Sequence, residues 1–457
     1  MTTPFRYQLE DARALHRLGG RCLIASEMGL GKSMISLLFA QQHPEARPII
    51  IICPASLKWN WQNECRKHFR WRAEVLEGKI PGRHAFVRNN QIVIINYDIL
   101  NGWLDYLQEL HAKLVIIDEC GSFLGNQSTL RTRTVRKLCQ GVPHVLALSG
   151  TPLVNRPAEM WPTLNILHPR QFPSFWPFGM AFCGPRRIPW GAGWDFRGSS
   201  NLDKLHQILF KDIAIRRRKA DVLSQLPAKQ RHVIPLEISD PKEYQHAHKD
   251  FVDWLAKVNP TKLSSALKAE RLVRLGYLKR LAAQLKIPAL LHWFDTFLRE
   301  SEGKLVIGTL HQFMIRELRQ KYRNLCVYVD GSVKGKDRQL AVDQFQNNRK
   351  TRIFLGQMKA AGTGLNLTAA HDSVAAEFDW SPGTHTQFED RCYGRLSDLH
   401  GANAWWLVAH GTIETHLVKI LQDKQETLTA VLDGGDGEEL NTFDLLMQSL
   451  IEKREEL

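Results

Sequence analysis

Residues 22–33 read Cys22-Leu23-Ile24-Ala25-Ser26-Glu27-Met28-Gly29-Leu30-Gly31-Lys32-Ser33. A short apolar run leads into a glycine loop and then a helical pattern, which predicts a buried strand that turns into a helix. At such a turn the main-chain N–H groups can wrap a phosphate chain. We expect Gly29 and Gly31 to form the loop, Lys32 to bind the phosphates and the Ser33 hydroxyl to bind Mg²⁺. The alternative, a tight turn with a chance Gly-Lys-Ser, is disfavoured by the flanking strand and helix.

An acidic pair follows another apolar run further along the chain. The apolar run 114–117 is followed directly by Asp118 and Glu119. We expect Asp118 to hold Mg²⁺ through water and Glu119 to act as the base that positions the attacking water. A pair of acids at the end of a strand is also a common helix cap, and only its combination with the phosphate loop favours hydrolysis of a nucleoside triphosphate.

Apolar runs recur in two separate blocks. Continuous apolar strands that alternate with amphipathic segments are typical of a buried parallel sheet, so two blocks predict two α/β lobes. The runs are 22–25, 49–53, 92–95, 114–117 and 145–148 in the first block, and 305–307, 326–329, 352–355, 373–378 and 404–408 in the second.

The segments outside these blocks differ in composition. Residues 168–200 are rich in Pro, Gly and Trp and predict an irregular insertion, whereas residues 240–300 read as long basic helices. We therefore expect a first lobe over 1–167, an insertion with helical protrusions and an inter-lobe linker over 168–300, a second lobe over 301–430, and a tail with a short brace helix over 431–457.

Composition narrows the class of protein. The chain has 457 residues, of which 44% are hydrophobic and 24% charged, which is an ordinary globular balance. Its formal net charge of +14 favours nucleic acid as the partner, with a membrane surface or plain solubility as alternatives. The eight cysteines form no C-x-x-C pair, which argues against zinc or a disulfide scaffold and favours a reducing compartment. Without an apolar span or signal peptide, we expect a soluble intracellular protein.

Together these segments resemble the Swi/Snf-like branch of superfamily-two helicases over nearly the whole chain. The motifs of the first lobe that carry the resemblance are Phe5-Arg6-Tyr7-Gln8, 27–33, Cys53-Pro54-Ala55-Ser56-Leu57 with Trp59-Asn60-Trp61 and Glu64, Asn96-Tyr97-Asp98, Asp118-Glu119 with Asn126, and Leu148-Ser149-Gly150-Thr151-Pro152 with Asn155. Those of the second are Asp330-Gly331-Ser332, Arg338, Phe345, 361–367, Trp380-Ser381-Pro382, and Gln387 with Glu389, Asp390 and Arg391. The segments 198–202, 216–222 and 226–230 are similar to those of the annealing-helicase (HARP-type) subgroup, whose members rewind DNA and remodel stalled forks.

The resemblance implies two RecA-like lobes and assigns roles to particular residues. Gln8 would read the adenine of ATP, and Gly364 would join the nucleotide site. Contacts to the DNA backbone would come from Lys58, Trp59, Tyr97, Gly362 and Thr363, although Trp59 is more typical of a core residue than of a base stack. The basic run 216–219 would lie at the hinge between the lobes or form a solvated charge run.

Four positions depart from the family pattern. Gly121 stands where the family has a histidine, Gly125 where it has a lysine, and Ser26 where it has an aspartate. In the last motif the second arginine is displaced by one residue, if Arg395 is its equivalent. We expect Arg391 to be the main arginine that stabilises charge on the γ-phosphate, with Arg395 in a lesser catalytic role.

The resulting hypothesis is an ATP- and Mg²⁺-dependent translocase on DNA, most readily double-stranded or branched DNA. Translocation or rewinding is favoured over strand separation, because no wedge can be identified. The alternative is an ATP-gated DNA- or protein-binding clamp with weak or no hydrolysis, which Gly121 and the displaced arginine keep open. We expect a monomer, located in the cytoplasm if it is bacterial or phage-encoded and in the nucleus if it is eukaryotic.

Overall fold

The computed structural model describes residues 3–81, 92–150, 156–188, 193–222, 229–257, 265–333, 335–362, 365–393 and 401–433. The chain divides into two compact units. The first consists mainly of Met1–Arg186 and Trp194–Leu226, and the second mainly of Pro227–Glu426.

The first unit is built on a seven-stranded parallel sheet in the order β3-β4-β2-β5-β6-β1-β9. Its strands are β1 (Arg21–Ile24), β2 (Ile49–Cys53), β3 (Glu74–Val75), β4 (Ile92–Asn96), β5 (Leu114–Asp118), β6 (His144–Leu148) and β9 (Ala214–Ile215). Its helices are α1 (Arg6–Arg17), α2 (Lys32–Gln42), α3 (Lys58–Phe69), α4 (Leu104–Glu109), α5 (Cys120–Leu124), α6 (Leu130–Leu138), α7 (Trp161–Leu167), α8 (Phe175–Phe182), α9 (Leu202–Asp212) and α10 (Lys219–Val222).

Both faces of this sheet are covered, which is why its strands are apolar throughout. In β2, Ile49 and Ile51 pack into one hydrophobic cluster, whereas Ile50 and Ile52 pack into another. Successive side chains of a strand point to opposite faces, so a run without polar residues requires helices on both sides. A small two-stranded sheet, β7 (Arg186–Arg187) with β8 (Trp194–Asp195), stands apart from this core.

The second unit is built on a six-stranded parallel sheet in the order β10-β15-β14-β11-β13-β12. Its strands are β10 (Gln230–Leu236), β11 (Leu305–Thr309), β12 (Cys326–Val329), β13 (Ile353–Gln357), β14 (Asp372–Ala375) and β15 (Asn403–Ala409). Its helices are α11 (Pro241–Lys257), α12 (Ser265–Leu285), α13 (Ile287–Glu300), α14 (Gln312–Lys321), α15 (Gly335–Asn347), α16 (Met358–Ala361), α17 (Pro382–Glu389) and α18 (Ile413–Asp433).

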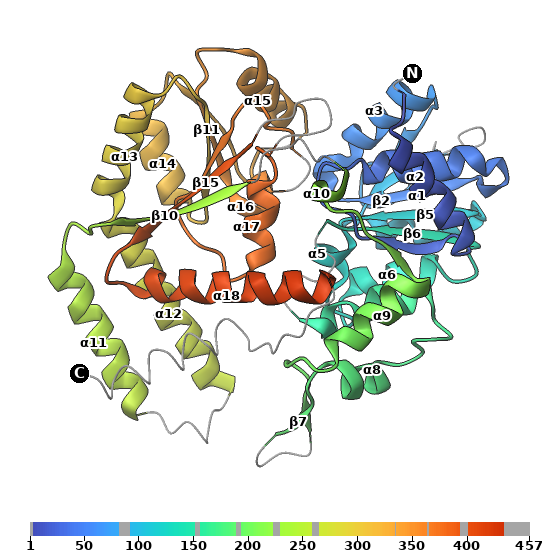
Figure 1. The fold of residues 1–457 in the computed structure, drawn as a ribbon, viewed down its shortest axis with the longest axis horizontal. Helices are drawn as coiled ribbons and strands as arrows, with labels where there is room; N and C mark the ends of the chain where they lie inside the picture. The colour runs from blue at the N-terminus through green and yellow to red at the C-terminus, as the bar shows by residue number, and fades with distance from the viewer. Residues whose placement is uncertain are drawn as a thin grey trace. The chain divides into compact units, whose positions relative to one another are not determined.

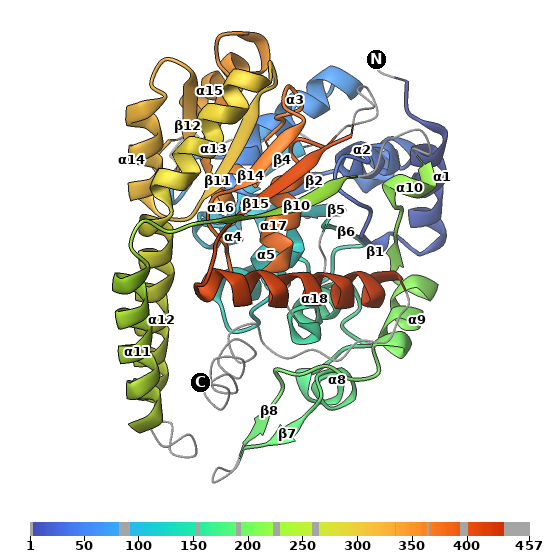
Figure 2. The ribbon, with the colours of Figure 1, turned by 60° about the vertical axis from the view of Figure 1, so that its left-hand side comes forward.

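Helices α11 and α12 lie side by side and extend beyond this sheet (Figures 1 and 2). Apolar residues on their facing surfaces, Tyr244, Phe251 and Leu278, cluster with Ile413 and Ile420 of α18. None of the helices in the described part of the chain is long and apolar enough to cross a membrane.

A buried ion pair ties three elements of the second unit together. Lys286, at the junction of α12 and α13, is fully buried. Its Nζ donates to Glu414 Oε2 of α18 at 2.6 Å and to the carbonyl oxygen of Leu407 in β15 at 2.9 Å. A charge so deep in the protein is tolerated only when it is paired and hydrogen-bonded, so this contact fixes how the helices join the sheet.

The ten strands predicted from the apolar runs are confirmed, as is the fold class of two parallel α/β units. The segment 168–300 does not form a body of its own, because its first part packs in the first unit and residues from Pro227 onward pack in the second. Strands β3, β9 and β10 of the two large sheets were not predicted. Strands β3 and β9 have only two residues each, and β10 is not a continuous apolar run, since six of its seven residues are exposed or half-buried. The helix predicted in the tail lies outside the described residues.

Replacing Lys286 with methionine should strongly destabilise the chain. The change leaves the carboxylate of Glu414 buried without its charge partner, which typically costs ~3–5 kcal/mol. Chemical denaturation followed by circular dichroism measures the loss. The double variant Lys286→Met/Glu414→Gln should recover much of it, because the buried charge is then gone. A single variant as stable as the wild type would contradict a structural role for this pair.

Candidate nucleotide and nucleic-acid site

The phosphate loop connects β1 to α2 and has the conformation that its glycines allow. Gly29 and Gly31 have φ values of 87° and 75°, which side-chain-bearing residues rarely adopt. Lys32 begins α2, and its Nζ donates to the carbonyl oxygens of Ser26 at 2.8 Å and Glu27 at 3.1 Å. The ammonium group therefore lies over the loop, where a bound phosphate would meet it. Ser33 follows in the first turn of α2 and is half-buried.

The basic run 216–219 holds the start of this loop in place. The main-chain N–H of Arg217 donates to Ser26 Oγ at 3.2 Å, and the N–H of Glu27 donates to the carbonyl oxygen of Arg217 at 3.0 Å. The N–H of Lys219 donates to Glu27 Oε2 at 2.8 Å. These contacts exclude a simple solvated charge run, and they give Ser26 a role as the acceptor at the position where the family has aspartate.

Gln8 packs directly against the loop. A Cβ at Gly31 would lie only 2.4 Å from Gln8 Nε2, so the two residues touch. Gln8 Oε1 accepts from the N–H of Phe5 at 3.0 Å, and the neighbouring Tyr7 hydroxyl donates to the carbonyl oxygen of Leu30 at 2.9 Å. The start of α1 is thus joined to the phosphate loop, which places Gln8 beside it; the contact to adenine stays a prediction.

The acidic pair lies in the interior at the end of β5. Asp118 Oδ2 accepts from the indole N–H of Trp61 at 2.8 Å, and the carbonyl oxygen of Asp118 accepts from the Tyr97 hydroxyl at 2.6 Å. Burial and the charge of Glu119 raise the pKa of Asp118 to about 7, while the hydrogen bond from Trp61 and the charge of Lys32 act in the opposite direction. The structure thus brings Lys32, Asp118 and Glu119 into one site.

Glu119 departs from ordinary backbone geometry. Its φ is 55°, in the left-handed region, and it immediately precedes α5. A residue other than glycine rarely adopts this conformation unless its surroundings impose it, and such residues cluster at functional sites. The sharp turn sets the direction in which the chain leaves β5, directly after Asp118.

Gly150, which directly follows β6 and Ser149, also lies at this site. A Cβ at Gly150 would lie 2.4 Å from Met28 Sδ and 3.3 Å from Lys32 Nζ. The end of β6 therefore packs directly against the side chains of Met28 and Lys32, and a larger residue at position 150 would displace them. The signal available in the sequence was the Ser149-Gly150 pair directly after an apolar strand.

The first-unit residues predicted to touch DNA are placed differently from one another. Lys58 is buried and its Nζ donates to the carbonyl oxygen of Leu76 at 2.9 Å, and Tyr97 is buried beneath the acidic pair. Their side chains face interior partners, which contradicts a direct contact to the DNA backbone from these positions. Trp59 is 44% exposed, so the interpretation of Trp59 as a core residue is wrong; Trp61 takes that place.

A cavity of about 570 Å³ lies where the chain departs from its family. Its lining includes Gly121 and Gly125 together with Asn126, Arg131 and Arg156. Both glycine positions at which the resemblance implies a histidine and a lysine therefore line this cavity. A Cβ at Gly125 would already lie 3.3 Å from Glu159 Cβ.

In the second unit, Arg391 is buried against a predicted DNA-binding residue. Its Nε donates to the carbonyl oxygen of Gly362 at 2.7 Å, and its side chain is 5% exposed. Arg338 lies near enough that burial and the positive charge of Arg391 lower its pKa to about 10. Arg391 therefore positions the turn at Gly362, and its contact to a γ-phosphate stays a prediction. Arg395, Thr363 and Gly364, and likewise Thr151, Pro152 and Asn155, lie outside the described residues.

The residues just before Arg391 belong to a buried charge network. Arg231 of β10 donates from Nη2 to Glu389 Oε2 at 2.7 Å, and Lys229 Nζ lies 3.0 Å from the same oxygen and 2.9 Å from Asp390 Oδ1. The Trp406 indole N–H donates to Glu389 Oε1 at 2.9 Å. Burial alone would raise the pKa of Glu389, but the charges of Lys229 and Arg231 outweigh it and lower the pKa to about 2.

Glu389→Gln should lower stability at neutral pH and flatten its acid dependence. Because the folded-state pKa of about 2 lies below the ordinary 4.5, the carboxylate stabilises the fold above about pH 4.5. This contribution is lost as the pH falls from about 4.5 toward 2. Denaturant unfolding across that range should show the gap between wild type and variant closing. The exposed Glu302→Gln should follow the wild type; a gap that stays constant with pH would contradict the network.

The chain matches two family models. The SNF2-related domain model matches residues 7–286, and the helicase conserved C-terminal domain model matches residues 286–395. A solved structure, the Sulfolobus solfataricus SWI2/SNF2 ATPase core in complex with dsDNA, is similar with a TM-score of 0.44 and 22% identity, over 98% of this chain and 96% of that one.

Curated relatives resemble the chain over most of its length. It is 32% identical over 416 residues to the Xenopus laevis SWI/SNF-related matrix-associated actin-dependent regulator of chromatin subfamily A-like protein 1, covering 90% of this chain and 42% of the relative. It is 30% identical over 434 residues to the Homo sapiens DNA annealing helicase and endonuclease ZRANB3, covering 91% and 39%. The chain thus spans about two fifths of the length of these relatives. With the SNF2-related model matching well over half of its residues, the chain belongs to the SNF2-related family.

Proposed function

We propose that this chain is a DNA-dependent ATPase that hydrolyses ATP to move along double-stranded or branched DNA and to remodel or rewind it. One observation carries the proposal: a glycine phosphate loop with Lys32 lies at the same site as the buried acids Asp118 and Glu119. The family match supports the class of reaction, and the relatives named as an annealing helicase and a chromatin regulator support DNA as the track.

The residues at this site fit ATP with Mg²⁺. Asp118 has a pKa raised by burial and by Glu119, so a cation beside it would supply the missing positive charge. Among the described residues no cluster of three or more His, Cys, Asp or Glu could hold a metal by itself. Ser33 and Asp118 would therefore share Mg²⁺ with phosphate oxygens and water, as is usual for this ion. When bound, Mg²⁺ would neutralise charge on the phosphates.

The residues of the chain would then have separate roles in binding and hydrolysing ATP. Lys32 would hold the phosphates as a point charge, and the loop N–H groups would cradle them. Glu119 would accept the proton of the attacking water. Gln8 would contact the adenine, and Arg391 or Arg395 would stabilise charge on the γ-phosphate, with Gly364 near the nucleotide.

Contacts to DNA would come from positions that the resemblance singles out and from the basic residues of the chain. The net charge of +14 favours a polyanion. Our proposed contact set is Trp59, which is exposed, together with Gly362 and Thr363, which the resemblance assigns to DNA contact. We further propose that the chain acts as a monomer, in the cytoplasm of a bacterial or phage-infected cell or in the nucleus of a eukaryotic one.

A second function has a specific observation in its favour. Gly121, which lines the cavity, stands where the resemblance implies the histidine that links hydrolysis to movement, and its absence favours weak coupling of hydrolysis. In that case the chain would be an ATP-gated clamp on DNA or protein. ATP turnover with and without DNA distinguishes the two functions.

Duplex DNA should stimulate ATP hydrolysis, and Lys32→Ala should abolish it without unfolding the protein. The lysine is a charge on the phosphates and contributes little to the core.

Arg391→Ala should lower the rate of ATP turnover by ~10³ or more while ATP affinity changes little, because the arginine acts in the transition state.

The affinity for DNA should fall at least ~10-fold between 50 and 200 mM salt, and by the same factor for unrelated sequences. ATP binding without DNA-stimulated turnover would instead establish the clamp.

Trp61→Phe should weaken Mg²⁺-dependent turnover by roughly tenfold, because Asp118 loses the N–H donor that favours its charged form. The Mg²⁺ concentration needed for half-maximal activity should rise. Tyr97→Phe removes the hydroxyl bound to the Asp118 main chain and should have a smaller effect. Trp71→Phe serves as the matched control, since Trp71 packs on Arg47 and Phe69. Unchanged Mg²⁺ dependence in Trp61→Phe would show that this hydrogen bond does not tune the acid.

A further inference from the structure

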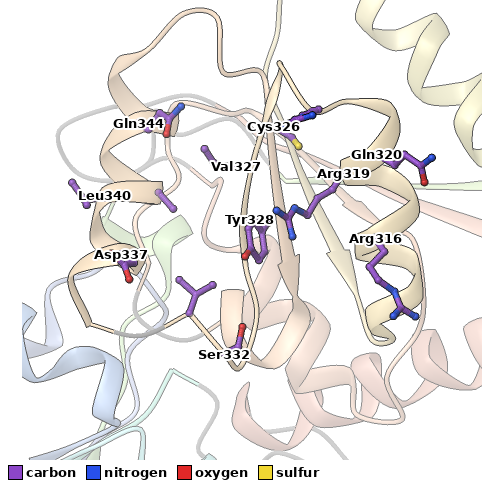
Figure 3. Close-up of a pocket in the computed structure, with 13 residues that line it drawn as sticks. Arg316, Arg319, Gln320, Cys326, Val327, Tyr328, Ser332, Asp337, Leu340 and Gln344 are labelled. Carbon is purple, nitrogen blue, oxygen red and sulfur yellow. The ribbon is translucent and has the colours of Figure 1, made fainter.

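A groove of about 880 Å³ runs along the outer edge of the second sheet. Strand β12 forms its floor, α14 forms one wall and α15 the other (Figure 3). The α14 wall carries Arg316 and Arg319, with Arg323 just after the end of that helix, and the α15 wall carries Asp337 and Leu340. None of these residues belongs to the ATP site or the DNA contacts described above.

The floor of the groove is an unpaired strand edge. Among the described strands, β12 pairs only with β13. The carbonyl oxygen of Leu325 accepts from the N–H of Ile353 at 3.0 Å, so Leu325 and, two residues on, Val327 direct their main-chain groups toward β13. The main-chain groups of the alternate residues, Cys326 and Tyr328, therefore point to the open edge. An exposed edge of this kind is a template for another strand.

The α14 wall is positively charged and available. Arg316 and Arg323 are exposed and form no hydrogen bond or ion pair with any described residue. The guanidinium carbon of Arg319 lies 3.6 Å from the centre of the Tyr328 ring, which fixes it over the strand (Figure 3). Asp337 is the one acid in the described lining, so three arginines face a single carboxylate.

The α15 wall is apolar at its centre. Leu340 is 63% exposed, which is unusual for a leucine beside a sheet edge, and Ala341 lies next to it along the groove. A strand inserted between the walls would direct alternate side chains to opposite sides. One set would meet the arginines, and the other set would meet Leu340.

We propose that this groove binds an extended acidic peptide segment of a partner protein, which adds as a parallel or antiparallel strand to the free edge of β12. Acidic side chains on one side pair with the arginines, and apolar side chains on the other pack on Leu340. Peptide is favoured over nucleic acid because the edge offers main-chain donors and acceptors in alternation and the opposite wall is apolar. The proposal does not depend on ATP turnover.

The probe is a fluorescein-labelled peptide of about eight residues in which glutamate and valine alternate. Fluorescence anisotropy with the 457-residue chain should show saturable binding. Arg316→Glu/Arg323→Glu should weaken binding by about tenfold or more, since two attractions become repulsions. Lys242→Glu/Lys249→Glu on α11, exposed and equal in charge change, should bind as the wild type does.

Two further peptides test the strand itself. N-methylation of alternate amides, in the register that removes donors to β12, should abolish binding, whereas the other register should leave it intact. A peptide with the same composition but all glutamates in one block should bind at least several-fold more weakly. Equal binding of the blocked peptide, or of both methylated registers, would overturn strand addition.

Nucleic acid is tested as the competing occupant. Unlabelled duplex DNA should not displace the peptide at concentrations that saturate the DNA site, and the arginine double variant should bind DNA as the wild type does. Displacement by DNA together with loss of DNA affinity in the double variant would overturn the proposal and assign the groove to nucleic acid. Failure of any acidic peptide to bind would mean that the arginines only keep the edge from pairing. Circular dichroism confirms that each variant is folded.

Discussion

The buried carboxylate of Asp118 is the constraint around which the first unit is organised. It lies at the end of a strand whose other residues are fully apolar, so the protein must supply every group that stabilises its charge. Trp61, from the helix after β2, gives an N–H to one oxygen, and Tyr97, from the turn after β4, fixes the main chain beneath it. Lys32 contributes opposite charge from the turn after β1. The segments after β1, β2 and β4 thus converge on the carboxylate at the end of β5, because the carboxyl ends of parallel strands share one edge of the sheet.

The phosphate loop depends on the same edge for support. Its start is held by the main chain after β9, and its glycine at position 31 is covered by Gln8 from α1. Both contacts come from other elements of the unit, one through the main chain of Arg217 and the other through the side-chain amide of Gln8. The departure at Ser26 is understandable in these terms, because a hydroxyl suffices to accept the N–H of Arg217.

Buried ion pairs in the second unit position segments of the chain that are distant in sequence. Glu389 joins the last family motif to β10 through Lys229 and Arg231, and Glu414 joins α18 to the end of α12 through Lys286. Such pairs add little net stability compared with apolar packing, yet breaking one partner is costly. They therefore enforce one arrangement of distant segments. Lys229, which belongs to one of the segments that resemble the annealing-helicase subgroup, acquires a physical role here, since it anchors the motif that carries Arg391.

The two parallel sheets follow from the sequence, because continuous apolar strands must be covered on both faces, and so does the phosphate loop, because glycine readily adopts the positive φ that this strand-to-helix turn uses. The sequence also located Asp118 and Glu119, since their place at a strand end follows from the apolar run before them. Which side chains are accessible depends instead on tertiary packing. Helix α3 buries Trp61, Cys65 and Phe69 on one face and so exposes Trp59, and Lys58 turns inward to the Leu76 carbonyl. Tertiary packing also brings Gly150 to the loop and Glu389 to Lys229, and it leaves β12 at the edge of the described sheet beside three arginines. These contacts join residues that are distant in the chain. Local sequence patterns do not predict them, because they depend on the order and register in which the strands assemble.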